Sequence, residues 1–381
     1  DRFDLRRDIQ FSTRVTSAIF NEKSNYWRVT TDQGDVLSAR FVVFATGCLS
    51  STNVPHFIGA DSFTGPTYHT GEWPHEGVDF TGKSVGLIGT GSSAIQSIPI
   101  IAAQAKHLTV FQRTATYSIP ARNDTIDKEY VKEVKNNYNE FRDQNRQQMG
   151  AFGSRIRRNE QSALEVSDSE RRQEFERRWE EGGFAFLSSY TDFLLNNDAN
   201  ETVAEFVREK IYSIVKDPDT AKKLLPKQVI GCKRLCLDSG YYETFNRPNV
   251  SLVDVSTDPI ERITEHGLVA GGEDHTFDVL VYATGFDAMT GSLLKIDIRG
   301  RNNQPLAEAW EAGPVTYLGL STAGFPNMFM VSGPGSPSVL TNMIMSIEQH
   351  VEWISDCISH IVASGKTTIE TTDTEQTQWV A

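Results

Sequence analysis

A glycine-rich turn at residues 89–94 has the spacing that binds the pyrophosphate of a dinucleotide. It reads Gly89-Thr90-Gly91-Ser92-Ser93-Ala94, a G-x-G-x-x-A pattern. Gly89 would allow the tight turn, Gly91 would let the backbone approach a phosphate, and Ala94 would let the next helix pack closely on the sheet. The free N–H groups at the start of that helix would then bind the phosphate oxygens.

A positive charge follows this motif, at Arg113 in the stretch Phe111-Gln112-Arg113-Thr114. Folds that bind NAD usually place Asp or Glu at this point to bind the ribose hydroxyls, and this stretch has neither. A guanidinium group matches the charge and shape of a 2′-phosphate. The sequence therefore predicts NADPH rather than NADH as the ligand. A solvated surface arginine is the alternative interpretation.

The elements that must position these residues are a strand, a helix and a second strand. Residues 85–88 form a short apolar run, a helical pattern extends from the glycine turn to about Ala105, and residues 108–111 are apolar again. Together they predict one βαβ unit of a parallel sheet. Pro99 falls inside the helical pattern, so we expect it to kink or end the helix.

A seven-residue pattern occurs twice, and this indicates two copies of one domain type. Phe41-Val-Val-Phe-Ala-Thr-Gly47 is followed 238 residues later by Val279-Leu-Val-Tyr-Ala-Thr-Gly285. Alternating segments precede each copy: 9–20, 26–31 and a strand over 36–45 for the first, and 250–255, 260–264 and 277–282 for the second. We therefore expect an α/β fold with two Rossmann-like, dinucleotide-binding domains.

No glycine-rich turn precedes the first copy, so we expect the first domain to be incomplete and to lack its N-terminal βαβ unit. Residues 372–381 resemble the beginning of a helix, with a capping residue and acids but no stop signal. The sequence is thus expected to be a fragment at both ends. As it stands, it is expected to bind NADPH weakly and FAD poorly, and to show no turnover.

The composition is that of an ordinary soluble protein. It has 381 residues, a net charge of −13 and 39% hydrophobic residues. The negative charge argues against nucleic acid or anionic membranes as partners, and no apolar run approaches the roughly 20 residues that span a bilayer. The four cysteines have no zinc or disulfide-framework spacing, so Cys232 and Cys236 are predicted to be free thiols in a cytoplasmic protein.

Residues 124–227 are rich in Arg, Glu, Asn and Gln, with aromatic residues at helical spacings. This composition predicts a helical insertion in the second domain. A solvated lobe and a lid over a substrate cavity are both compatible with it.

A second motif precedes the glycine turn and carries a family resemblance. The stretch from Phe63 to Pro74 fits F-x-G-x-x-x-H-x-x-x-W-P, with fixed positions Phe63, Gly65, His69, Trp73 and Pro74. It resembles the signature of Baeyer–Villiger monooxygenases. Related flavin enzymes that oxygenate nitrogen or sulfur usually carry Tyr or Phe at the position of Trp73. Further stretches resemble the same family: 89–96, 111–114, 233–234, 241–243, 246–249 and 332–338.

The resemblance implies an FAD- and NADPH-dependent enzyme that inserts one oxygen atom of O2 next to a ketone carbonyl, through a C4a-peroxyflavin, to give an ester or lactone. It implies an FAD domain over residues 1–54 and 283–381, and an NADP domain over 55–123 and 228–282, with 124–227 inserted. The resemblance implies that the enzyme's partners are a small-molecule ketone and O2. The expected oligomeric state is a monomer or homodimer.

The resemblance also assigns roles to single residues. Arg234 would stabilise the anionic peroxide and adduct, because an arginine cannot give up its proton to quench them. Lys233 would bind the 2′-phosphate together with Arg113, and His69 would be a hinge residue rather than an acid or base. Besides residues 89–94, the cofactor-binding candidates are Gln96, Thr114 and Met343. The substrate-pocket candidates are Ser338, Val339 and Leu340.

Three other interpretations remain open from the sequence. The first is a flavin monooxygenase that oxygenates nitrogen or sulfur, which Trp73 and Pro74 disfavour. The second is a disulfide reductase with two dinucleotide domains, which the missing redox cysteine pair disfavours. The third is a nucleotide-binding remnant without activity.

Overall fold

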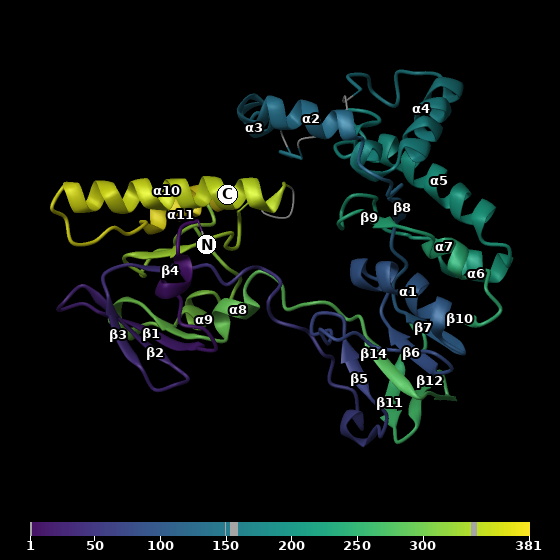
Figure 1. The fold of residues 1–381 in the computed structure, drawn as a ribbon, viewed down its shortest axis with the longest axis horizontal. Coiled ribbons are helices and arrows are strands. Elements are labelled where there is room, and N and C mark those ends of the chain that lie inside the picture. Colours follow the sequence, from purple (N-terminus) through teal and green to yellow (C-terminus); the bar gives the residue numbers. More distant parts are fainter. Residues whose placement is uncertain (1, 149, 153–158, 337–340) are drawn as a thin grey trace. The chain divides into compact units, whose positions relative to one another are not determined.

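The computed structural model describes residues 2–148, 150–152, 159–336 and 341–381, and the chain divides into two units (Figure 1). Unit 1 comprises Asp1–Ser51, Asn137–Gly153 and Phe286–Ala381, and unit 2 comprises Thr52–Asn136 and Ser154–Gly285. Within the described residues, no helix is both long and apolar enough to cross a membrane. All four cysteines are free thiols, which confirms the prediction for Cys232 and Cys236.

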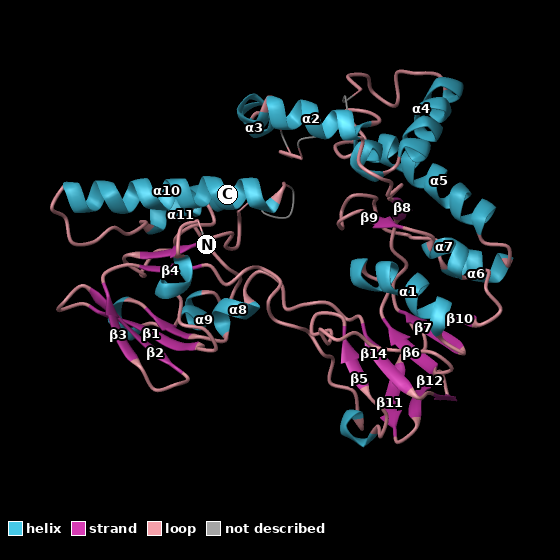
Figure 2. Cartoon of the chain, viewed as in Figure 1, coloured by secondary structure: helices cyan, strands magenta, loops and turns pink. Residues whose placement is uncertain are grey.

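Unit 2 is built around a five-stranded parallel sheet, in the order β10-β7-β6-β14-β5 (Figure 2). The strands are β5 (Thr67–His69), β6 (Ser84–Ile88), β7 (His107–Gln112), β10 (Val250–Asp254) and β14 (Val279–Tyr282). The central strands are buried almost throughout, because both faces of a parallel sheet are covered. This explains their continuous apolar runs.

The predicted βαβ unit is confirmed. Strand β6 leads through the glycine turn into helix α1 (Ser92–Gln104), and the chain then enters β7, which pairs with β6. Pro99 lies inside α1 and does not end it, so that part of the prediction is wrong. The fully buried side chains of Ile95 and Ile98 fix the helix on the sheet.

Two smaller sheets and a helical lobe complete unit 2. An antiparallel meander consists of β11 (Ile260–Thr264), β12 (Gly267–Ala270) and β13 (Glu273–Thr276), and a parallel two-stranded ribbon consists of β8 (Ser118–Pro120) and β9 (Cys236–Asp238). The helices are α2 (Lys128–Asn136), α4 (Asp168–Glu181), α5 (Asn197–Ile214), α6 (Pro218–Lys223), α7 (Tyr241–Thr244) and the 3-10 turns Ala60–Ser62 and Gly183–Ser188.

The helical lobe has a core of its own in which aromatic rings touch. Phe175, Phe186 and Phe206 lie with ring centroids 5.3 to 6.2 Å apart. Helix α4 begins at a capping box formed by Ser167 and Glu170. The residue spacing of these aromatics therefore reflects packing within the lobe.

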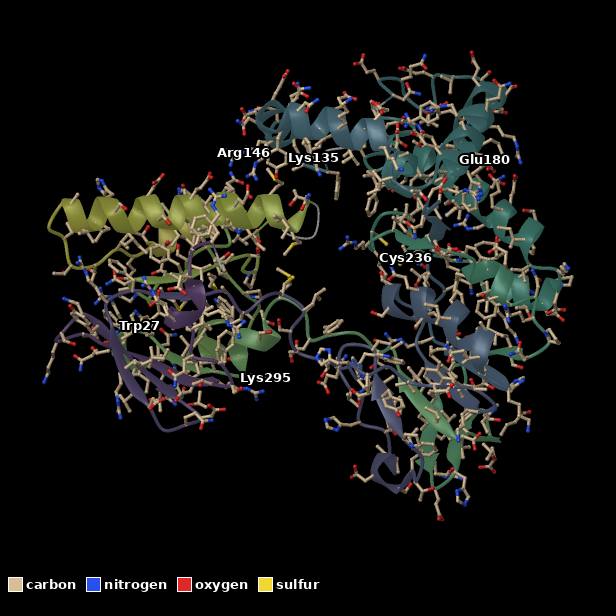
Figure 3. The ribbon with its side chains drawn as sticks, viewed as in Figure 1. Trp27, Lys135, Arg146, Glu180, Cys236 and Lys295 are labelled. Atoms are coloured by element: carbon tan, nitrogen blue, oxygen red, sulfur yellow. The ribbon has the colours of Figure 1, made fainter. Side chains whose placement is uncertain are left out.

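The sequence placed all of 124–227 in one insertion, whereas the structure assigns residues 137–153 of it to unit 1. These residues include helix α3 (Tyr138–Arg146), which bonds to helix α10 (Met343–Ala363). Arg142 forms an ion pair with Glu348 at 2.5 Å, and Arg146 forms one with Glu352 at 3.1 Å. Figure 3 labels Arg146. Charged side chains therefore join α3 to α10, although most residues of α3 are exposed to solvent.

Unit 1 contains a four-stranded sheet, β15-β1-β2-β3, and a parallel pair, β16-β4. The strands are β1 (Val15–Asn21), β2 (Tyr26–Thr31), β3 (Val36–Ala39), β4 (Val42–Phe44), β15 (Asp297–Arg299) and β16 (Met328–Met330). Further helices are α8 (Gly291–Leu294), α9 (Leu306–Ala309), α11 (Asp373–Val380) and the 3-10 turns Leu5–Asp8 and Arg301–Asn303. Trp27 is fully buried in its core and donates to the Pro326 carbonyl at 2.8 Å (Figure 3).

The single strand expected over residues 36–45 is in fact two strands in different sheets. Strand β3 pairs antiparallel with β2, while β4 pairs in parallel with β16. The second copy of the repeat breaks at the equivalent point, where β13 ends the meander and β14 enters the parallel sheet. A run of apolar residues cannot reveal such a break, because both strands satisfy the same pattern. The expected strand over 9–20 likewise begins only at Val15.

Candidate functional site

Unit 2 contains a cleft of about 580 Å³ at the carboxyl ends of its parallel strands. The residues that follow β6, β7, β10 and β14 line it, together with residues 53–57 and 233–236. Ligands of open parallel sheets bind at this edge. The cleft is therefore the natural candidate for the functional site of this unit.

The glycine turn forms one wall of the cleft, and its two glycines have different physical roles. Gly89 has a φ of +116°, and a Cβ atom there would lie 2.4 Å from the carbonyl oxygen of Ala283. A side chain at Gly91 would meet nothing within 4 Å, so the open space beside it is available to a ligand. Gly91 is also the N-cap of α1, whose first N–H groups lack helical partners.

Three cationic side chains converge on the same cleft: Arg113, Lys233 and Arg234. All three are exposed, and none forms an ion pair with any residue that the structure describes. Among the residues that the structure describes, no acidic one lines this cleft. Cations gathered without carboxylates are suited to a phosphate-bearing ligand, since guanidinium and ammonium groups bind phosphate oxygens strongly.

The structure brings together most of the predicted cofactor-binding residues. Gly89, Thr90, Gly91, Ser92 and Thr114 line the cleft with the three cations. The hydroxyl of Thr90 donates to the carbonyl of Thr114 at 2.8 Å, which joins the glycine turn to the stretch after β7. The two motifs that the sequence identified separately are thus parts of one wall.

Other predicted residues lie elsewhere. Ser93, Ala94 and Gln96 are on α1 and do not line the cleft; Ala94 is fully buried against the sheet, and Gln96 is exposed. Met343 is the first residue of α10 in unit 1. Ser338, Val339 and Leu340 lie outside the described residues.

His69 ends strand β5 and is buried behind the cleft wall. Its Nδ1 accepts from the backbone N–H of Gly71 at 3.0 Å, so its Nε2 carries the proton of the neutral ring. Nε2 lies 3.4 Å from the hydroxyl of Thr284, which itself donates to the Asn53 carbonyl at 2.5 Å. The ring therefore binds polar groups next to residues 51–53 and 284–286, where the chain passes between the units.

The other residues of the second motif are structural in their contacts. Trp73 packs on Tyr68 and Phe80, with ring centroids 5.8 and 6.0 Å apart. A Cβ atom at Gly65 would lie 2.5 Å from the Asp278 carbonyl oxygen. Phe63 packs, half-buried, against the core beside the meander, and Pro74 accepts a turn hydrogen bond from Gly77.

Cys236 is a cleft residue that the sequence analysis did not identify. Its Sγ lies 3.0 Å from the hydroxyl of Ser92 at the start of α1, and Figure 3 labels it in β9. Burial raises the pKa of this thiol, so it stays protonated at neutral pH. In the sequence, its position two residues after Arg234 is the feature that could have indicated a place in the cleft. Phe57, Pro259 and Ile260 form an apolar wall of the cleft, which no sequence pattern predicted.

Unit 1 offers a second polar feature, in the loop that follows β16. Ser332 has a φ of +56°, which is unusual for a residue with a side chain, and its N–H donates to Nδ1 of His350 at 3.1 Å. The hydroxyls of Ser332 and Ser336 are buried without a hydrogen-bond partner among the described residues.

Comparison with known proteins places the chain among flavin monooxygenases, although no protein-family profile matches it. A Baeyer–Villiger monooxygenase of Pseudooceanicola batsensis is 43% identical over 383 residues, which are 100% of this chain and 69% of the relative. A phenazine N-monooxygenase of Lysobacter antibioticus is 42% identical over 384 residues, 100% of this chain and 70% of the relative.

Solved structures agree with this result. A steroid monooxygenase bound to NADP superposes with a TM-score of 0.93 at 54% identity, covering 100% of this chain and 72% of that one. The enzyme called OTEMO, in complex with FAD and NADP, superposes with a TM-score of 0.95 at 41% identity, covering 99% of this chain and 72% of that one. Two Rossmann-like domains are therefore confirmed as the fold class.

Proposed function

This chain belongs to the Baeyer–Villiger monooxygenases, FAD- and NADPH-dependent enzymes that insert one atom of O2 beside a ketone carbonyl, and we propose which of its residues perform the reaction. The observation that carries the proposal is the convergence of the glycine turn with three unpaired cations on one cleft. The substrates of the enzyme are a small-molecule ketone and O2. We propose arylketones, cycloalkanones or steroid-like ketones as the substrate class.

The cleft of unit 2 binds NADPH in this proposal. The turn from Gly89 to Ser92 holds the pyrophosphate, because Gly91 leaves room for it and the start of α1 supplies N–H donors. Arg113 and Lys233 bind the 2′-phosphate, whose two negative charges match their exposed cationic groups. None of the cleft-lining residues is acidic, so nothing there competes for the two cations.

Arg234 has the chemical role. The bound cofactors together supply the reducing equivalents and activate O2. Arg234 adds a permanent positive charge that stabilises the negative charge developing on the ketone oxygen as the new bond forms. A lysine or histidine in this position could lose its proton to the activated oxygen, whereas a guanidinium group cannot.

The test compares Arg234→Ala with Arg262→Ala, a change of an exposed arginine on β11 that does not line the cleft. In an FAD-loaded enzyme as long as the relatives, of which this chain spans 69%, Arg234→Ala should still oxidise NADPH but form at least about 100-fold less ester, with the oxygen released as hydrogen peroxide. Arg262→Ala should behave like the unchanged enzyme. A normal ester yield from Arg234→Ala would remove Arg234 from the mechanism.

Oxygenation of a heteroatom is the second candidate, because one relative at 42% identity is a phenazine N-monooxygenase. Trp73 speaks against it, since enzymes that oxygenate nitrogen or sulfur usually carry Tyr or Phe there. Product analysis separates the two functions. Incubation with a cyclic ketone, an aryl sulfide and an aromatic N-heterocycle should give mainly lactone if the first function is correct, and mainly sulfoxide or N-oxide if the second is.

A further inference from the structure

The β8–β9 ribbon connects the two halves of the proposed cofactor site. The strands are parallel, with Ser118 opposite Cys236 and Pro120 opposite Asp238. Because they are parallel, both begin at the same end of the ribbon. The residues just before β8 include Thr114 and Thr116, and those just before β9 include Lys233 and Arg234, and all of these line the cleft. The ribbon therefore determines the distance of Lys233 and Arg234 from the residues that precede β8.

Two parallel strands of three residues are too short to hold this arrangement by backbone hydrogen bonds alone. A buried carboxylate lies at the far end of the ribbon. Asp238 is 7% exposed, and it forms no ion pair with any lysine or arginine in the described part of the chain. Burying a charge without a cation is costly, so every hydrogen bond to it matters.

The hydrogen bonds of Asp238 join the two strands and the helix that follows. One carboxylate oxygen accepts a short hydrogen bond from the hydroxyl of Ser118 on β8. The other accepts from the N–H groups of Gly240 and Tyr241, both at 3.0 Å, at the start of α7. The hydroxyl of Tyr242 then accepts from the Ser118 N–H at 3.2 Å and donates to the Thr116 carbonyl at 3.3 Å.

We propose that Asp238 is a positioning residue, which fixes the β8–β9 ribbon and thereby places Lys233 and Arg234 opposite Arg113. This inference rests on the roles proposed above for these three cations. Asp238 itself does not line the cleft and so acts only through the residues that precede β9. Displacements of about 1 Å at a reacting group can reduce a rate about 100-fold, so a looser ribbon is enough to produce a measurable loss.

The first test measures binding by the full chain, with NADP⁺ and NAD⁺ as probes in calorimetric titrations. Asp238→Asn keeps the shape of the side chain but removes its charge, which weakens the hydrogen bonds from Ser118, Gly240 and Tyr241. We expect NADP⁺ to bind about five- to tenfold more weakly and NAD⁺ less than about twofold more weakly, because only the 2′-phosphate depends on Lys233. Ser118→Ala, a milder change at the same bond, should show the same selective loss.

Asp217→Asn is the matched control, because the Asp217 carboxylate likewise accepts from a backbone N–H at the start of a unit 2 helix, that of Thr220 at 2.8 Å. Among the described residues it has no hydrogen bond to the ribbon. Its affinities for both nucleotides should be unchanged. The proposal is overturned if Asp238→Asn and Ser118→Ala are folded and bind NADP⁺ within twofold of the unchanged chain. It is also overturned if they lose NADP⁺ and NAD⁺ affinity equally.

The second test is a double-variant comparison in the FAD-loaded enzyme. Asp238→Asn alone should lower the yield of ester per NADPH about tenfold, with peroxide released instead. In the background of Arg234→Lys it should cause little further loss, because a residue that acts through Arg234 has no effect once Arg234 is replaced. Fully additive losses would overturn the positioning role. If an enzyme as long as the relatives, of which this chain spans 69%, forms no ester from any ketone, the proposed function fails, whereas the nucleotide titrations still decide on Asp238.

Discussion

The two copies of the repeat have nearly the same sequence but occupy different environments. Strand β4 in unit 1 pairs with β16 alone, among the residues that the structure describes, whereas β14 in unit 2 lies between β6 and β5. Val43 in β4 is 43% exposed, while the equivalent Val281 in β14 is fully buried. The turns that follow have the same backbone form, with φ of +75° at Gly47 and +85° at Gly285.

This difference separates what a local sequence decides from what its neighbours decide. The Ala-Thr-Gly turn forms in both copies, so its conformation depends on the residues themselves, above all on a glycine that tolerates positive φ. Burial and ligand binding depend on the surrounding strands. In unit 2, a glycine turn from β6 and a cationic stretch from β7 meet the Ala-Thr-Gly turn in one cleft.

The largest effect is expected from the same substitution made in each copy. Val281→Ala should lower the free energy of unfolding of unit 2 by about 2–3 kcal/mol, because it removes two methyl groups from a packed interior. Val43→Ala should cost unit 1 less than about 0.5 kcal/mol, as is usual for exposed sites. Hydrogen exchange measured on individual peptides gives the two units separate readouts. Equal losses of stability would mean that β4 is as well buried as β14, and would contradict the difference in burial between the two copies.

A smaller effect is expected at the cleft itself. Arg113→Ala should weaken NADP⁺ binding at least about tenfold and NAD⁺ binding less than about twofold, because it removes one charge-assisted contact to the 2′-phosphate. Arg14→Ala changes an equally exposed arginine in unit 1 and should alter neither. Calorimetric titration of both nucleotides checks this. Equal weakening of both nucleotides by Arg113→Ala would show that the arginine does not read the 2′-phosphate.

Much of unit 2 could be predicted from the sequence, because its signals are local. The turn from Gly89 to Ala94, the strands on either side of it and the charge of Arg113 are close together in the chain. Each also obeys a rule that depends on few other residues: a glycine spacing, an apolar run or a helix start. Placing Lys233 and Arg234 in the same cleft required the family resemblance, because more than 100 residues separate them from Arg113.

The features that could not be predicted depend on long-range pairing. Nothing in residues 36–45 shows that β3 and β4 join different sheets, because the partner β16 lies almost 300 residues further along the chain. From the sequence alone, Asp238 resembles an ordinary acidic residue of a loop, because its hydrogen-bond partner Ser118 is far away in the chain. The assignment of α3 to unit 1 follows from Glu348 and Glu352 on α10, which residues 124–227 do not reveal.

The smallest effect concerns acid and is expected in unit 1. His350 in unit 1 is buried, and burial lowers its pKa below the usual value of about 6.5. In the native state its Nδ1 must remain unprotonated to accept from Ser332. The unfolded chain therefore binds the proton first as the pH falls.

Unit 1 should accordingly lose stability between about pH 6.5 and the lowered pKa of His350, at up to about 1.4 kcal/mol per pH unit. The carboxylates of unit 2 whose pKa is lowered, such as Asp192, stay ionised in this window, because their pKa is lowered from a value already near 4. His350→Gln should abolish the loss, since a glutamine oxygen can accept from Ser332 but does not titrate. Peptide-resolved hydrogen exchange at pH 7.0 and 5.5, corrected for intrinsic exchange rates, measures this, and an unchanged acid response in His350→Gln would assign it to another group.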